Sequence, residues 1–262
     1  MTRFGIPTFM AFRTIEEHLR FCADLGLPFF ELNLSFPWFQ TNRVDVDELI
    51  RLGKEYGISY TIHMHDQFNP FDFSPELRGG SLELAQNTME IALRIHAPRI
   101  TMHMLPGMYS SVKGEKVFGY AVGEADYLEN ADYFAKRMNS ILNGSGSLLC
   151  IENTNGYKSY HKKAMELMLG YPCFGLTFDI GHNYKAGGVD EDFILSHADR
   201  LKHFHIHDVN EKANHIALGT GLMDILRYIE MCKSFSCSAV LEVKETNSLV
   251  QSVEYLKTHN MF

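Results

Sequence analysis

The sequence has no run of apolar residues long enough to span a bilayer. Its first residues, MTRFGIPTFM, also lack the charged flank and apolar stretch of a secretory signal. The five cysteines are odd in number, scattered, and never spaced as CxxC, which disfavours both a disulfide framework and a thiolate zinc site. We therefore expect a cytoplasmic protein with no membrane partner and with reduced, buried thiols.

An excess of basic residues is also missing. The sequence has 24 lysines and arginines against 32 aspartates and glutamates, which gives a formal net charge of −8. A negative net charge disfavours long-range attraction to nucleic acid, although a local basic groove would still be compatible with it. The composition therefore argues against a nucleic-acid partner and leaves small molecules as the expected ligands.

Helical and apolar segments alternate along the chain. FCADLG precedes LPFFELNL, LGKEYG precedes ISYTIHMH, and IALRIHAP precedes RITMHM. Such alternation indicates parallel βα units. Eight strands are expected, near Phe4–Thr8, Phe29–Leu34, Ser59–His65, Arg99–Met104, Leu148–Asn153, Phe174–Asp179, Leu201–Asp208 and Ala239–Val243. With 45% hydrophobic residues in 262, the sequence predicts an α/β fold of one domain, residues 1–262, as a (β/α)8 TIM barrel.

Helices are expected where the 3.6-residue apolar period is clearest. Thr14 and Glu17 form a capping-box pattern, while Gly26 and Gly57 occupy positions typical of helix C-caps. The clearest segments are Ile15–Leu25, Leu82–Arg94, Tyr127–Leu142, Met223–Cys232 and Leu249–Thr258.

Two connections are longer than ordinary links and carry aromatic residues. The first, residues 33–44, contains Phe36, Trp38 and Phe39, and the second, residues 104–123, contains several aromatics and glycines. Long βα loops are usually functional, so both are expected to wall a substrate site at the barrel mouth. Aromatic patches that only seal the core against neighbouring loops are the alternative.

Seven of the eight expected strands end in, or lead into, groups able to bind a metal or move a proton. In a parallel barrel these ends meet at one rim. A single histidine or glutamate there is commonly a hydrogen-bonded structural residue, but one metal centre would explain the whole set. The groups are Glu31, Asn33, His63, His65, Asp66, His103, Glu152, Asn153, Asn155, Asp179, His182, His205, His207, Asp208, His215, Glu242 and Lys244, and His203 shares a strand face with His205 and His207. Their oxygen and nitrogen atoms suit Mn, Zn, Co or Mg.

Six segments with ionisable residues at or after expected strand ends follow one another along the chain: SYTIHMHDQFNPFDFS, RITMHMLPG, LLCIENTNG, LTFDIGHNY, HFHIHDVN with NHIALGTG, and AVLEVKE. In the order and spacing of these motifs the chain resembles the xylose-isomerase-like TIM barrels, which include ketose 3-epimerases, inosose dehydratases and zinc-dependent apurinic endonucleases. The resemblance implies that Glu152, Asp179, His205 and Glu242 hold one divalent ion. It further implies that Glu152 and Glu242 act as acid and base on opposite faces of the substrate.

The endonuclease branch of that family adds further metal ligands. His63 and His103 match one additional set, and His182 and His215 match part of another. The last set normally includes an aspartate two residues before the loop histidine, where this chain has Ala213. Epimerases resemble one another in an arginine soon after the strand-seven histidine, and here Glu211 and Lys212 stand in that region, which leaves the substrate open.

The leading hypothesis is a divalent-metal-dependent sugar or sugar-phosphate isomerase or epimerase. It would transfer a proton between Glu152 and Glu242 through an enediolate. The expected substrate contacts are Glu31, Trp38, His63, His103, His182 and Lys244. The alternatives are a zinc-dependent phosphodiesterase on abasic DNA, an inosose-type dehydratase, and a binding protein with a vestigial site. We expect a monomer or a homodimer.

Overall fold

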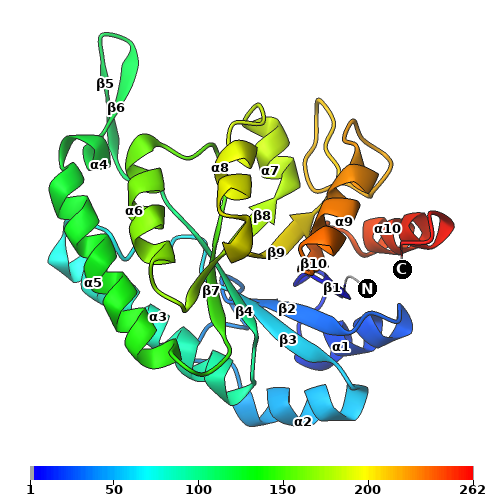
Figure 1. Ribbon diagram of the computed structural model, residues 1–262. Helices are drawn as coiled ribbons and strands as arrows, with labels where there is room; N and C mark the ends of the chain where they lie inside the picture. The colour runs from blue at the N-terminus through cyan, green and yellow to red at the C-terminus, as the bar shows by residue number, and fades with distance from the viewer. Residues whose placement is uncertain (1–2, 262) are drawn as a thin grey trace.

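Eight parallel strands close into a barrel in the computed structural model, which describes residues 3–261 (Figure 1). Around the barrel they follow the order β1-β10-β9-β8-β7-β4-β3-β2. Their bounds are β1 Arg3–Ile6, β2 Phe29–Asn33, β3 Ser59–His63, β4 Arg99–His103, β7 Leu148–Glu152, β8 Phe174–Asp179, β9 Leu201–Ile206 and β10 Ser238–Leu241. All eight predicted strands are confirmed, with each end within 2 residues of its expected place.

Helices cover the outside of the barrel (Figure 1). They are α1 Ile15–Asp24, α2 Val46–Tyr56, α3 Pro75–Arg94, α4 Gly119–Val122, α5 Glu124–Leu142, α6 Ser159–Leu169, α7 Ile180–Lys185, α8 Glu191–Ser196, the 3-10 turn η1 Ala198–Arg200, α9 Ile225–Ser234 and α10 Thr246–Thr258. Helix α3 begins well before the predicted Leu82, because Ser74 caps its N-terminus and Pro75 occupies the first turn. Within residues 3–261, no helix combines the length and apolarity that a membrane crossing requires.

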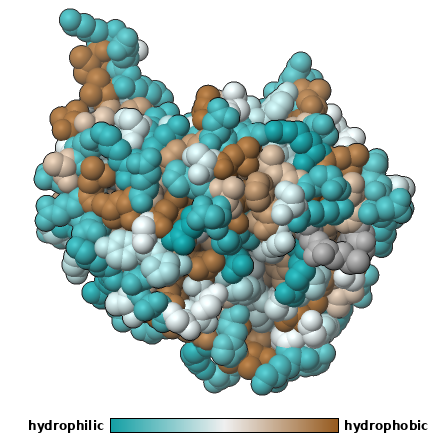
Figure 2. Space-filling view, in the orientation of Figure 1, coloured by the Kyte–Doolittle hydropathy of each residue, from teal (hydrophilic) through white to brown (hydrophobic). Residues whose placement is uncertain are grey.

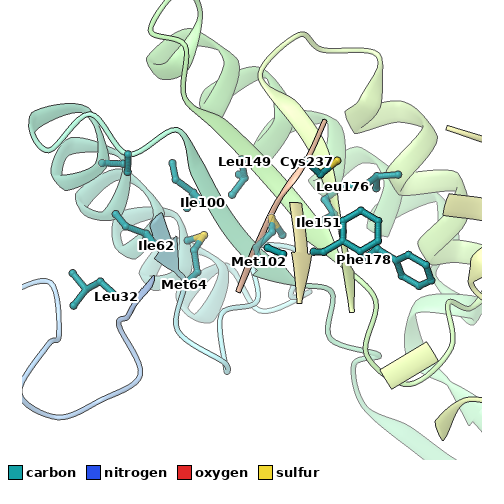
Figure 3. Close-up of a cluster of buried hydrophobic side chains, with 14 of the residues drawn as sticks. Leu32, Ile62, Met64, Ile100, Met102, Leu149, Ile151, Leu176, Phe178 and Cys237 are labelled. Atoms are coloured by element: carbon teal, nitrogen blue, oxygen red, sulfur yellow. The ribbon is translucent and has the colours of Figure 1, made fainter. Parts of the chain in front are cut away.

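Successive side chains along each strand alternate between the outer face of the barrel, towards the helices, and its interior. Apolar residues of β2, β3, β4, β7 and β8 form the buried layer between barrel and helices, as Figure 3 shows for Leu32, Ile62, Ile100, Leu149 and Leu176. The alternate positions point inward and are largely polar, including three threonines, Thr61, Thr101 and Thr177. The hydrophobic core therefore lies between the strands and the surrounding helices, and the side chains inside the barrel are mainly polar or ionisable.

The start of α1 confirms the predicted capping box. The Thr14 hydroxyl accepts the Glu17 N–H, and the Glu17 carboxylate accepts the Thr14 N–H at 2.8 Å. His18, on the buried face of this helix, donates from Nδ1 to the Thr14 carbonyl at 2.8 Å and accepts the Phe9 N–H at Nε2. Its ring stacks on Phe30 with centroids 4.6 Å apart. Burial lowers the pKa of His18 to about 4 and keeps the ring neutral.

We expect His18 to make folding sensitive to acid. Its pKa is lower in the folded chain than the ordinary 6.5, so its contribution is complete above pH 6.5 and is lost as the pH falls towards 4. The gap corresponds to about 3 kcal/mol of unfolding free energy. Denaturant unfolding between pH 7 and 4 should therefore show a shallower loss in His18→Gln than in the wild type. The exposed His259→Gln is the control, and equal pH slopes in all three proteins would contradict the assignment.

The long connection between β4 and α5 contains an antiparallel hairpin, β5 Tyr109–Val112 and β6 Glu115–Phe118. The hairpin projects above the barrel, and the space-filling view shows mixed polar and apolar side chains along it (Figures 1 and 2). Met108, Tyr109 and Val112 are each more than half exposed. The sequence analysis predicted a loop at this place, but the chain pairs with itself and extends away from the barrel.

Candidate functional site

A cavity of about 470 Å³ opens at the carboxyl ends of the barrel strands. Nine of the strand-end residues that were expected to meet at one rim line it, whereas Glu152, Asp179 and His205 are fully buried beside it. The lining consists of Pro7, Thr8, Met10, Glu31, Asn33, Phe36, His63, Asp66, His103, His182, His215, Glu242, Val243 and Lys244. No residue of the connection 104–123 is among them, so the expectation that this connection walls the barrel mouth is wrong.

The centre of this site consists of four residues, Glu152, Asp179, His205 and Glu242. One ligand atom from each lies within 4.8 Å of the others, and these residues come from four neighbouring strands or strand ends. Nδ1 of His205 lies 3.0 Å from Oε1 of Glu152 and 3.1 Å from Oε2 of Glu242. That Glu242 oxygen is buried, and its contact with His205 is within ion-pair distance but is not aligned as a hydrogen bond. Buried carboxylate oxygens without donors are costly, so this donor set fits a divalent cation.

The second carboxylate oxygen of Glu152 faces two further histidines. Its Oε2 lies 3.1 Å from Nε2 of His103 and 3.3 Å from Nε2 of His63. Because Nδ1 of His63 donates to the Met64 carbonyl at 2.8 Å, Nε2 is the atom that faces Glu152, as a donor when the ring is protonated and as a free ligand atom when the ring is neutral. Glu152 thus stands between His205 on one side and a histidine pair on the other, where a carboxylate can bridge two cations.

A third cluster joins His182, His207 and His215. Nδ1 of His215 donates to the Glu242 carbonyl at 2.9 Å, which leaves its Nε2 unengaged. His207 differs, because its Nδ1 accepts the His215 N–H at 3.2 Å and its Nε2 donates to both oxygens of Asp179 at 3.1 Å. His207 therefore orients Asp179 and His215, and Ala213 contributes no carboxylate to this cluster.

Opposite charges set the protonation of the centre. Burial disfavours the charged form of His63, but the hydrogen bond to Glu152 and its charge outweigh burial and raise the His63 pKa to about 9. Burial likewise opposes ionisation of Glu152, yet the charges of His205 and His103 hold its pKa well below the ordinary value. The pKa of Asp179 is lowered against burial by His207 and other imidazoles. Protonated imidazoles thus neutralise the charge of the carboxylates, and a bound cation would displace the imidazole protons.

Glu31 lies deeper than a substrate contact is expected to lie. It is 3% exposed at the cavity floor, and its Oε1 lies 3.1 Å from Nε2 of His205. That contact is within ion-pair distance but is not aligned as a hydrogen bond. Its other oxygen accepts the Thr61 hydroxyl at 3.1 Å and lies 3.4 Å from Nε2 of His203. Glu31 therefore faces the back of His205, beneath the cluster.

The other predicted substrate contacts divide into two groups. His63, His103, His182 and Lys244 line the cavity. Trp38 does not, because its ring packs against Phe36 and Phe39 and lies under the guanidinium of Arg13. Phe36 takes the cavity-facing place in this connection. The aromatic run was therefore identified correctly as a wall element, but the residue that faces the cavity is two positions away.

Asp208 was grouped with the strand-end ligands, but it organises the loop that follows β9. It is buried and accepts backbone N–H groups from Val209, Gly219, Gly221 and Met223 at 2.8–3.2 Å. A side chain at Gly221 would meet an Asp208 oxygen at 2.2 Å, so glycine is required there. The GTG sequence after His215 was the signal for such a compact turn.

The chain is similar to one family of known proteins and to several solved structures. A family model described as xylose isomerase-like TIM barrel matches residues 19–259. The uncharacterized protein MJ1614 of Methanocaldococcus jannaschii is 24% identical over 220 residues, covering 80% of this chain and 81% of that protein. Among solved structures, 3-keto-D-glucoside 4-epimerase YcjR from E. coli is 15% identical with a TM-score of 0.79, covering 98% of this chain and 100% of that one. The IolI protein with a bound zinc atom is 12% identical with a TM-score of 0.72, covering 99% and 95%.

Proposed function

The chain belongs to the xylose isomerase-like TIM barrel family, and from that premise we propose that it is a divalent-metal-dependent isomerase or epimerase of a sugar or sugar phosphate. The observation that carries this proposal is the convergence of Glu152, Asp179, His205 and Glu242 within 4.8 Å beside a cavity of small-molecule size. A sugar epimerase among the structural neighbours supports it.

The donor set supports the ion-binding part of the proposal. Three carboxylates and one imidazole would hold Mn, Zn, Co or Mg, and the donor-free Glu242 oxygen would gain a partner. The zinc atom bound to the related IolI fold supports a metal at such a site. When bound, the ion would polarise vicinal substrate oxygens and make the carbon-bound proton between them more acidic.

The two glutamates would move the proton. Glu242 has a side chain 25% exposed towards the cavity, whereas that of Glu152 is 1% exposed, so Glu242 meets an entering substrate first. One carboxylate removes a proton, the enediolate forms, and the other returns a proton to a different face or carbon. His182 would orient a substrate hydroxyl, and Lys244 would bind a substrate carboxylate or phosphate at the rim.

Glu31 would support the metal site through His205 and would not touch the substrate. We expect Glu31→Gln to lower metal affinity about 10- to 100-fold, because partners behind a metal-bound histidine fix its orientation and basicity. Competition with a chromophoric chelator measures the affinity, and Glu83→Gln, at an exposed position of α3, is the matched control. A Glu31→Gln protein with wild-type affinity and a raised KM would instead restore Glu31 as a substrate contact.

A metal-dependent phosphodiesterase is the second candidate. The observation in its favour is the position of Glu152 between His205 and the pair His63 and His103, which suits two ions. The net charge of −8 and the absence of a basic excess speak against a nucleic-acid substrate. An inosose-type dehydration shares the first proton removal with the leading proposal and differs only in the loss of a hydroxyl group, so product analysis separates them.

Metal analysis of protein purified without added metal tests the proposal. One ion per chain that is lost in Asp179→Asn, together with exchange of a ketose proton in deuterated water, is the expected result. Two or three zinc ions per chain with cleavage of abasic DNA would favour the phosphodiesterase. Protein that takes up no divalent metal under any loading condition would overturn both metal-dependent functions.

A further inference from the structure

A second cavity, of about 210 Å³, opens at the opposite end of the barrel. Its lining includes the first residues of several barrel strands, so it lies at their amino ends, away from the candidate active site. The lining residues are Arg3, Phe29, Ser59, Tyr60, Thr61, Pro98, Arg99, Ser236, Cys237 and Ser238. Nothing in the proposed sugar chemistry uses this end of the barrel.

Positive charge gathers at this cavity without a carboxylate to balance it. Arg3 and Arg99 line it, and no carboxylate of residues 3–261 lies within 4.0 Å of either guanidinium or of the Lys202 ammonium. Lys202 lies near the cavity, since its charge and that of Arg99 act on the Cys237 thiol, whose pKa burial nevertheless raises to about 11. Three unpaired cations are unexpected in a chain of net charge −8.

The two guanidinium groups keep free donors. Arg3 makes one hydrogen bond, from Nη2 to the Ser59 hydroxyl at 3.3 Å. Arg99 donates from Nη1 to the Pro98 carbonyl at 2.7 Å and from Nε to the Lys202 carbonyl at 3.5 Å. The remaining N–H groups of both side chains have no acceptor among residues 3–261. Planar guanidinium donors next to serine hydroxyls match the oxygens of a tetrahedral oxyanion.

We propose that this cavity binds a small oxyanion of the phosphate class, either inorganic phosphate or the phosphate group of a small monoester. The anion would accept hydrogen bonds from the free N–H groups of Arg3 and Arg99. The Ser59 hydroxyl, which already donates to the Pro28 carbonyl at 3.2 Å, would form part of the wall. Ser238 contributes the wall, with its hydroxyl already bonded to Nδ1 of His203 at 2.7 Å. Binding at this end would not compete with a substrate at the other end, because the filled barrel interior separates the two cavities.

Isothermal titration of metal-free protein tests the site without interference from a bound ion at the other cavity. Inorganic phosphate and glycerol 3-phosphate are titrated separately against a background of chloride at equal ionic strength. We expect one phosphate per chain with a dissociation constant of about 1 mM or lower, and at least about tenfold weaker binding in Arg99→Gln. Binding of both probes indicates a phosphate group as the ligand, whereas binding of phosphate alone indicates the free ion.

Two further variants keep the test decisive. Arg3→Gln, at the exposed start of β1, should weaken binding even if Arg99→Gln fails to fold. Arg51→Gln, which removes an exposed arginine paired with Glu55 on α2, should bind phosphate as the wild type does. Absence of saturable binding, or equal affinity in the Arg3, Arg99 and Arg51 variants, would overturn the proposal. Since Glu152→Gln should leave this affinity unchanged, failure here is distinguishable from failure of the proposed metal chemistry.

Discussion

Glu152→Gln is expected to lower kcat/KM for sugar isomerisation or epimerisation by about 10⁴-fold and to reduce bound metal strongly. Each carboxylate oxygen of Glu152 has its own partners, with Oε1 at 3.0 Å from His205 and Oε2 at 3.1 Å from His103. Glutamine retains one acceptor oxygen and places an NH₂ donor at the other position. The change therefore removes a negative charge, a ligand atom and the group that carries a proton.

Two measurements separate these effects. Metal per chain is determined on the purified variant, and deuterium incorporation into the ketose is followed at saturating metal, so that lost proton transfer is visible even when the ion is restored. Glu166→Gln, at an exposed position of α6, is the control for a glutamate-to-glutamine change. A Glu152→Gln protein that keeps both its metal and its exchange rate would remove Glu152 from the mechanism and with it the proposed pairing with Glu242.

The strands and the rim were predictable because both follow from short-range patterns. Buried parallel strands are continuous apolar runs, and all their carboxyl ends face one way, so Glu152, Asp179 and His205 could be brought together before any coordinates were known. The depth of each side chain along the barrel axis was not predictable from the sequence. It depends on the register between strands, which sets Glu31 opposite Thr61 and Asn33 opposite His63. Glu31 consequently lies one layer below His63, facing His205.

The connections were the least predictable part because no periodic pattern specifies their path. The aromatics of residues 33–44 do reach the cavity, but packing between Trp38 and Arg13 turns the indole away and leaves Phe36 inside. The segment after β4 pairs Tyr109 with Phe118 in a hairpin that points away from the mouth. Composition identified both segments as unusual, whereas the contacts that decide their direction lie between residues distant in sequence.

The loop after β9 gives the second large expected effect, on stability. Asp208→Ala should lower the free energy of unfolding by about 4 kcal/mol, since it leaves buried N–H groups without acceptors. The carboxylate accepts from Gly219 and Gly221 through Oδ2 and from Val209 and Met223 through Oδ1. Its backbone also pairs with Ile216 at 3.1 Å, directly after His215. Loss of Asp208 therefore frees the segment that presents His215 to the cavity.

Denaturant unfolding compares Asp208→Ala with Asp224→Ala, a matched loss of an aspartate. Asp224 is exposed and accepts one N–H, from Arg227 at 3.2 Å, as the N-cap of α9. That cap is worth about 1 kcal/mol, so the two variants should differ about fourfold in destabilisation. Equal losses would show that the Asp208 hydrogen bonds are replaced by water in the variant. In the expected case, His215 also loses its fixed bond to the Glu242 carbonyl, and metal-dependent activity falls at temperatures where the barrel is still folded.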